Sequence, residues 1–439
     1  MTIETVPGTS TKYYLIAFDA DGRERTDDPD GLMSRRVLDA MRSDNVTDVF
    51  LLSHGWKGDI PAARAQYGAW MGAMLACRQD LELAAARRPG FKPLLVGLHW
   101  PSLPFGVEDF GSAGVSFAAV SGDPIESMVD RCAERIVDTP AARAALRTIF
   151  ESALRDTAPA TLPEQVRQAY KVIDEESALG SRGVGGSPGD DREPFDPDAA
   201  YGNAMNQSMS FGGGGLSALL SPLAQLSFWK MKDRARTFGE SGSFGLVSSL
   251  MRASDGGDVR FHLMGHSFGC IVASATVNGP PGARLPRPVS SLVLVQGALS
   301  LWSYCSSIPH APGKAGYFRR IVADHLVAGP IVTTRSEFDT AVGSLYPVAA
   351  GVAEQVTFAP GELPRYGGVG TFGARGPGLD IVDLKMLSAT SVYDFRPERI
   401  HNLDAGGVIC EGDPPSGAHS DIAKPEVAHV VWSAAIPMN

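Results

Sequence analysis

The expected fold is decided by one stretch, Val259-Arg260-Phe261-His262-Leu263-Met264-Gly265-His266-Ser267-Phe268-Gly269. Residues 259–264 indicate a buried strand, and the apolar run 270–277 after the turn indicates a helix. A serine between two glycines on such a strand-to-helix turn is typical of a nucleophile elbow. Side chains larger than hydrogen at Gly265 and Gly269 would collide with the neighbouring backbone of so sharp a turn. We therefore predict that Ser267 is a nucleophile.

Further apolar runs, separated by helical patterns, extend outward from this stretch. Because these runs are apolar throughout, they predict the strands of a parallel sheet that is covered by helices on both faces. This arrangement is a doubly wound α/β fold. A helix is expected to begin near Asp59 and to bury Tyr67, Trp70, Met71, Met74 and Leu75. The other strands are predicted at 13–18, 49–52, 94–98, 292–295 and 330–333, with a weaker one at 399–403.

Two blocks interrupt this alternation, so we expect a core formed by residues 1–103 and 246–439. Residues 104–245 contain helical patterns but no convincing strand, and they predict a helical lid inserted into the core. Within this block, 180–215 is rich in Gly, Ser, Pro and Asp and predicts a mobile loop. A second Gly-rich insertion is expected at 347–390.

Composition excludes several classes of protein. The chain has 439 residues, 44% of them hydrophobic, and a net charge of −10 without a basic cluster, which argues against nucleic acid as a partner. Its five cysteines are widely spaced, which argues against a disulfide framework and a zinc site. The N-terminus lacks a signal-peptide pattern, and no apolar run reaches 18 residues. We expect a cytoplasmic protein without a transmembrane segment.

The segment Ser53-His54-Gly55-Trp56 also ends a buried strand, so it is expected at the same edge of the sheet as the elbow. In a serine hydrolase this place supplies one of two backbone N–H donors to the oxyanion. We assign those donors to Trp56 and Phe268. His54, with Gly55, is expected to support this loop and not to act as a base.

A catalytic base should follow the last strand, and His419 does so. His401 and His429 fall within an expected strand and helix, and His310 and His325 come too early in the chain. The acid should lie between the nucleophile and the base, and we assign it to Asp339, six residues beyond the strand 330–333. Glu337 is the near alternative, and the distant ones are Asp394, Asp404 and Asp413.

Taken together, the strand–His–Gly–x–Trp segment, the GHSFG elbow and the later Asp and His resemble the α/β-hydrolase superfamily over 12–100 and 246–439. Residues 231–235, Met-Lys-Asp-Arg-Ala, resemble bacterial predicted serine esterases. The resemblance implies hydrolysis of a small-molecule or lipid-like acyl ester through an acyl-serine, without a metal or organic cofactor. It leaves open a thioesterase, an amidase, an acyltransferase and a non-catalytic binding protein on the same fold. The resemblance does not predict an oligomeric state.

Overall fold

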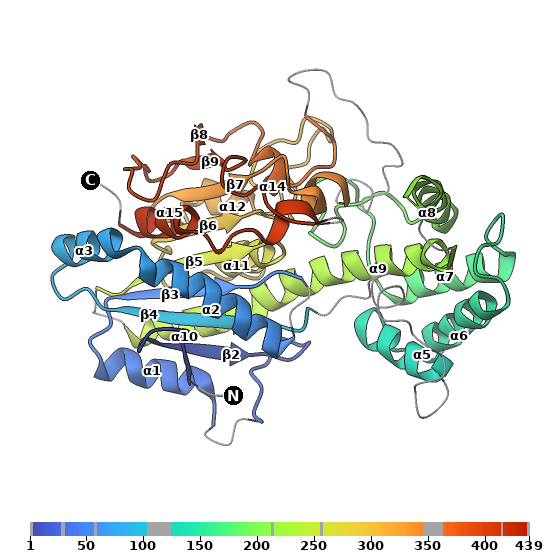
Figure 1. Ribbon diagram of the computed structural model, residues 1–439, viewed down its shortest axis with the longest axis horizontal. Helices are drawn as coiled ribbons and strands as arrows, with labels where there is room; N and C mark the ends of the chain where they lie inside the picture. The colour runs from blue at the N-terminus through green and yellow to red at the C-terminus, as the bar shows by residue number, and fades with distance from the viewer. Residues whose placement is uncertain are drawn as a thin grey trace. The chain divides into compact units, whose positions relative to one another are not determined.

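A nine-stranded, mostly parallel sheet organises the larger part of the computed structural model (Figure 1). The strand order is β1-β2-β4-β3-β5-β6-β7-β9-β8, and only β1 pairs antiparallel to its neighbour. The strands are β1 (Ile3–Thr5), β2 (Lys12–Ala17), β3 (Asp48–Ser53), β4 (Pro93–His99), β5 (Arg260–His266), β6 (Ser291–Val295), β7 (Ile331–Arg335), β8 (Ile381–Lys385) and β9 (Ile400–Asp404). The structure describes residues 3–27, 31–56, 59–102, 124–211, 215–254, 258–345, 363–413 and 416–436.

The chain divides into two compact units. The first comprises Met1–Ser102, Arg234–Tyr346 and Phe358–Asn439, and it contains the sheet. The second comprises Leu103–Asp233 and Pro347–Thr357.

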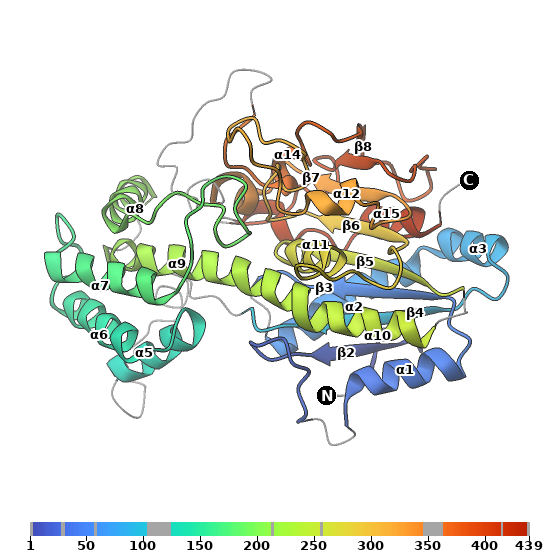
Figure 2. The same ribbon diagram turned by 180° about the vertical axis from the view of Figure 1, so that it is seen from behind.

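Helices cover both faces of the sheet, as a buried parallel sheet requires. On one face lie α2 (Ile60–Ala76), α3 (Arg78–Arg87) and α15 (Pro425–Ala435) (Figure 1). On the other lie α10 (Phe244–Ala253), α11 (Gly269–Asn278) and α12 (Arg319–Ala323) (Figure 2). The remaining helical segments of this unit are α1 (Met33–Ser43), η1 (Gly239–Ser243), η2 (Ala341–Leu345), α14 (Val369–Phe372) and η3 (Gly417–Ser420). The central strands β3 and β6 are buried along their whole length, in agreement with their unbroken apolar runs.

The expected helix at Asp59 is α2, and its first turn is stabilised as the sequence predicts. The Asp59 carboxylate accepts a hydrogen bond from the backbone N–H of Ala62 at 2.8 Å, and Pro61 occupies the first turn. Four of the predicted core side chains of α2 are buried, whereas Leu75 is half-buried.

Two strands were not predicted, and both are edge strands. β1 has three residues, and β8 alternates Ile, Val and Leu with Asp and Lys while remaining partly exposed. An edge strand buries little surface, so its sequence carries a weak apolar signal. β8 lies inside the expected insertion 347–390, and that segment therefore includes part of the sheet. Residues 346–362 lie outside the described part of the chain.

The described part of the second unit contains helices and loops but no strand. It contains α5 (Pro124–Arg135), α6 (Pro140–Arg155), α7 (Glu164–Glu176), α8 (Pro197–Phe211) and most of α9 (Gly215–Phe238), as far as Asp233. Leu154 continues the apolar spacing of the buried Leu146, Ile149 and Phe150 on α6, yet it is 51% exposed. Of the segment expected as a loop, 180–215, residues 197–211 form α8. Arg192, which belongs to the same segment, is buried. Its guanidinium group forms an ion pair with Asp174 and lies over the ring of Trp229.

No helix in the described parts of the chain combines the length and the apolar character that crossing a lipid bilayer demands.

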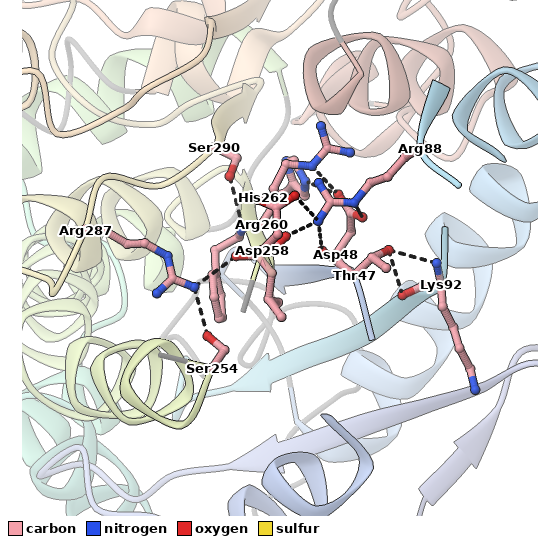
Figure 3. Close-up of polar contacts among 12 residues, drawn as sticks. Thr47, Asp48, Arg88, Lys92, Ser254, Asp258, Arg260, His262, Arg287 and Ser290 are labelled. Atoms are coloured by element: carbon pink, nitrogen blue, oxygen red, sulfur yellow. Dashed lines mark hydrogen bonds and ion pairs between the residues drawn. The ribbon is translucent and has the colours of Figure 1, made fainter. Parts of the chain in front are cut away.

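A buried ionic cluster joins the amino ends of β3 and β5 (Figure 3). Asp48 Oδ1 accepts hydrogen bonds from Arg260 Nε at 2.8 Å and His262 Nε2 at 3.1 Å, and Arg88 Nε lies 3.3 Å from Oδ2. Burial acts to raise the pKa of the Asp48 carboxyl. Hydrogen bonds from His262 and Thr47 and the nearby positive charges outweigh burial and bring this pKa below its ordinary value.

We predict that Asp48→Asn lowers the free energy of unfolding at neutral pH by about 3 kcal/mol, because it leaves two guanidinium groups around a neutral amide. A carboxyl with a depressed folded-state pKa stabilises the fold above its unfolded pKa of about 3.9, and this stabilisation is lost as the pH falls through the folded value. The difference in thermal midpoint between wild type and variant should therefore shrink as the pH falls from about 5 to below about 4.

Asp258→Asn is the matched control, because the Asp258 side chain is fully exposed beside the same Arg88. This control should leave the midpoint nearly unchanged. A gap between wild type and Asp48→Asn that stays constant with pH would contradict the role given to the carboxylate.

Candidate active site

Ser267 occupies the sharp turn between β5 and α11. Its φ is +56°, a left-handed conformation that costs free energy in a residue with a side chain. Its backbone N–H donates to Val295 O at 3.2 Å, and its own carbonyl accepts from Ala298 N at 3.2 Å. These bonds tie the turn to the end of β6. The elbow conformation expected from the sequence is therefore present, and Ser267 lies at the carboxyl end of β5.

Three glycines permit the close contacts of this turn. A Cβ at Gly265 would lie 2.2 Å from Gly269 O, and a Cβ at Gly269 would lie 2.1 Å from Ser53 O. A Cβ at Gly55 would lie 2.5 Å from the Cβ of Ser267. In each case the obstacle is fixed backbone or the first atom of a side chain. The segment 53–56 thus passes directly against the elbow.

Asp339 and His419, 80 residues apart in the chain, lie in hydrogen-bond contact. His419 Nδ1–H donates to Asp339 Oδ2 at 2.8 Å. Asp339 is fully buried, whereas the His419 side chain is 12% exposed. Because the carboxylate can only accept, Nδ1 carries the proton in the neutral ring, and Nε2 keeps its lone pair.

The two segments that carry this pair dock on each other through backbone contacts. Ala418 N donates to Phe338 O at 2.9 Å, and a Cβ at Gly417 would lie 2.4 Å from the same oxygen. Asp421 closes the preceding loop, because its Oδ2 accepts hydrogen bonds from the N–H groups of Cys410 and Glu411 and from Lys424 Nζ. His419 is therefore held by its backbone as well as by its ring.

His266 connects the elbow to His419. Its Nε2–H donates to the backbone carbonyl of His419 at 2.8 Å, and the two rings lie 4.8 Å apart between centroids. Burial lowers the pKa of His266 to about 3, so its ring is neutral around pH 7. The residue next to Ser267 thus fixes the position of His419 without competing for a proton.

The expected oxyanion residues lie side by side. The rings of Trp56 and Phe268 are 5.7 Å apart between centroids, and Phe268 caps the N-terminus of α11. Backbone N–H groups at a helix N-terminus favour negative charge because the first turn leaves them without intrahelical partners.

The loop before Trp56 is supported by buried polar contacts. His54 Nδ1–H donates to Gly55 O at 2.8 Å, and its Nε2 lies 3.0 Å from His99 Nδ1. The hydroxyl of Tyr67 accepts from His54 N at 2.8 Å and donates to Leu98 O at 2.6 Å. Burial lowers the pKa of His54 to about 4 and that of His99 to about 3. His54 is accordingly placed to support the loop, because a ring with so low a pKa is a weak base and its Nδ1–H is already bonded to Gly55 O.

The alternative acids and bases have other surroundings. Glu337 is exposed, Asp404 pairs with Arg335 at 2.9 Å, Asp394 pairs with Arg396, and Asp413 is exposed. His401 accepts a hydrogen bond from Arg396 N, His429 pairs with Asp80, His325 pairs with Glu398, and His310 contacts Leu363 O. None of these contacts involves Asp339, His419 or the elbow.

Sequence reasoning missed Gln296, whose Nε2–H donates to Asp339 Oδ2 at 2.9 Å. A signal for it existed, because Gln296 directly follows the strand 292–295 and so lies at the same sheet edge as Ser267. Within the described residues, no group of three or more His, Cys, Asp or Glu side chains is arranged to hold a metal ion.

We predict that Gly269→Ala destroys the elbow, because the added Cβ must displace the Ser53 carbonyl of the adjacent strand. The variant should lose several degrees of thermal midpoint or fail to fold. Gly245→Ala, in α10, is the matched control, since a Cβ there meets no atom within 4 Å. This control should raise stability by about 0.5–1 kcal/mol. Equal midpoints for the two variants would disprove the packing argument.

Comparison of the chain with protein-family models, with curated proteins and with solved structures finds no match. The role of each residue in this site is therefore argued from its geometry in this chain.

Proposed function

We propose that this protein is a serine hydrolase that cleaves carboxylic esters through an acyl-serine intermediate. The observation that carries the proposal is the arrangement at one sheet edge of Ser267 on a left-handed strand-to-helix turn and a hydrogen-bonded Asp339–His419 pair. His266 connects the two through the His419 carbonyl. The order Ser, Asp, His along the chain is the order found in α/β-hydrolases.

In the first half of the proposed reaction, His419 Nε2 takes the proton of the Ser267 hydroxyl while Oγ attacks the ester carbonyl. The backbone N–H groups of Trp56 and Phe268 stabilise the resulting oxyanion, a contribution of about 3–4 kcal/mol for one well-placed donor. His419 then gives the proton to the leaving alcohol, which departs and leaves the acyl group on Ser267. In the second half, water attacks the acyl-serine with the same proton transfers and releases the carboxylic acid.

Asp339 supports this chemistry by selecting the tautomer of His419. Its carboxylate holds the proton on Nδ1, so that Nε2 is free to accept one. When Nε2 becomes protonated, the buried negative charge of Asp339 stabilises the imidazolium.

We further propose that the mixed α/β unit is an α/β-hydrolase core and that the helical segment 104–245 is its lid. Supporting the first point are the parallel sheet and the serine at the carboxyl end of β5. Supporting the second is the helical, strand-free character of the described part of that segment. The substrate we propose is a small-molecule or lipid-like acyl ester.

We predict that a fluorophosphonate probe labels the protein once, on Ser267, because an activated serine reacts quickly with such electrophiles. Ser267→Ala should remain folded and should not be labelled. Ser274→Ala, which removes another buried hydroxyl in α11, should be labelled like the wild type. Intact-mass spectrometry measures all three. Labelling that persists in Ser267→Ala would rule out this nucleophile.

We predict that Asp339→Asn lowers turnover of p-nitrophenyl esters at least ~10²-fold, with ~10⁴-fold as the expectation where the three residues act as a unit. With the amide oxygen accepting from Val342 N, its NH₂ group faces His419 Nδ1 and Gln296 Nε2. The imidazole must then place its proton on Nε2, where it cannot act as a base. Glu337→Gln changes an exposed carboxylate two residues away and should have little effect. Near-normal turnover in Asp339→Asn would move the acid elsewhere.

A further inference from the structure

Gln296, the residue directly after β6, has a conformation that calls for an explanation. Its φ is +47°, and its side chain is fully buried. Glutamine rarely adopts this left-handed conformation, which costs of the order of 1 kcal/mol or more, and a buried amide must find partners for both of its ends. Nearby backbone leaves it little room, since a Cβ at Gly370 would lie 2.7 Å from the carbonyl carbon of Gln296.

Thr334 in β7 determines which way the amide of Gln296 points. The Thr334 hydroxyl accepts from Gln296 N at 3.0 Å and donates to Gln296 Oε1 at 2.9 Å. Because Oε1 accepts the hydrogen bond from the Thr334 hydroxyl, the Nε2 end of the amide is directed at Asp339. It donates to Oδ2 at 2.9 Å and lies 3.5 Å from Gly370 O.

The carboxylate of Asp339 is thus held at both oxygens. Val342 N donates to Oδ1 at 2.9 Å, while Gln296 Nε2 and His419 Nδ1 both donate to Oδ2. A buried carboxylate with these donors cannot rotate without losing a hydrogen bond. The orientation of Oδ2 toward His419 is therefore set by donors other than the imidazole as well.

We infer that Gln296 is a positioning residue for the proposed reaction, which aligns Asp339 with His419 through an amide whose orientation Thr334 fixes. This inference rests on the proposed hydrolase function. The hydrogen bonds of Gln296 go to Thr334 and Asp339 and not to Ser267, so it acts through Asp339. Its loss should therefore lower kcat and leave KM nearly unchanged.

The decisive variant is Gln296→Asn. Asparagine tolerates a positive φ better than glutamine, and this gain offsets part of the stability lost with the buried hydrogen bonds of the glutamine amide, so the variant should still fold. Its amide is one methylene shorter and cannot reach Asp339 Oδ2. We expect kcat to fall about ten- to a hundredfold, the effect of one hydrogen bond to a buried charge, in a variant that remains folded at the assay temperature. Glu398→Asn is the matched control, because exposed Glu398 also has a positive φ, of +63°, and should keep wild-type kcat.

Two further measurements separate positioning from a structural role. In the wild type, the His419 Nδ1–H proton should give a far-downfield NMR signal, and in Gln296→Asn this signal should move or broaden. In an Asp339→Asn background, adding Gln296→Asn should cause little further loss, because Gln296 acts through Asp339. Equal kcat and an unchanged proton signal in Gln296→Asn would overturn the inference. Full additivity of the two losses would do so as well.

Gln296→Glu gives a pH test of the same contact. The titratable groups around the introduced carboxyl are Asp339, its partner His419, and His266 beyond that ring. At low pH the introduced carboxyl is protonated and can donate to Asp339, whereas at higher pH two carboxylates face each other and repel. We expect a new loss of kcat as the pH rises, which the wild type lacks. A profile parallel to the wild type would contradict the inference.

The fluorophosphonate reaction of the wild-type chain distinguishes failure of the inference from failure of the proposed function. If the wild type is not labelled, the hydrolase proposal falls, and the inference falls with it as a statement about catalysis. If the wild type is labelled and Gln296→Asn reacts at the same rate, only the inference falls.

Discussion

The site depends on one steric constraint, the contact between the backbone of the elbow and the backbone at the end of β3. Ser53 O lies where a Cβ of residue 269 would be, and Ser267 lies against Gly55. This contact lets α11 start directly beside β3, which brings the loop 53–56 over the nucleophile. Within this turn Ser267 has a left-handed conformation. Parallel pairing of β5 with β3 and β6 supplies the surrounding rigidity that sustains this strain.

The sequence predicted the structure best where a single physical requirement, such as complete burial of a strand, determines which residues can occupy a segment. Buried parallel strands must be apolar throughout, so the ranges around 49–52, 259–264 and 292–295 could be predicted as strands. The cap at Asp59 and the glycines of the elbow follow from equally local rules. An edge strand such as β8 does not have to be apolar throughout, because one edge of its backbone has no neighbouring strand and its side chains are partly or fully exposed. Leu154 fits the apolar period of α6 but is exposed, since periodicity does not reveal how wide the packed face is.

The candidate site divides in the same way. Ser267, Asp339 and His419 could be proposed from their order and from the strands before them, because parallel strands bring their carboxyl ends to one edge. The hydrogen bonds that orient them could not, although the place of Gln296 directly after the strand 292–295 puts it at this edge. Gln296 contacts Asp339 across 43 residues and His266 contacts the His419 carbonyl across 153, and no sequence period marks such a pair. Asp421 clamps the loop through backbone N–H groups, which every residue carries and which therefore leave no signature.

Burial separates the histidines at this edge into two kinds. His54, His99 and His266 lie in desolvated positions, and burial depresses the pKa of each well below the ordinary value. Their neutral rings serve as fixed donors and acceptors, directed at Gly55, at each other or at the His419 carbonyl. His419 differs in two respects, since its side chain retains contact with solvent and a buried carboxylate faces Nδ1. The same sheet edge therefore holds neutral histidines that maintain geometry beside one whose surroundings suit proton transfer.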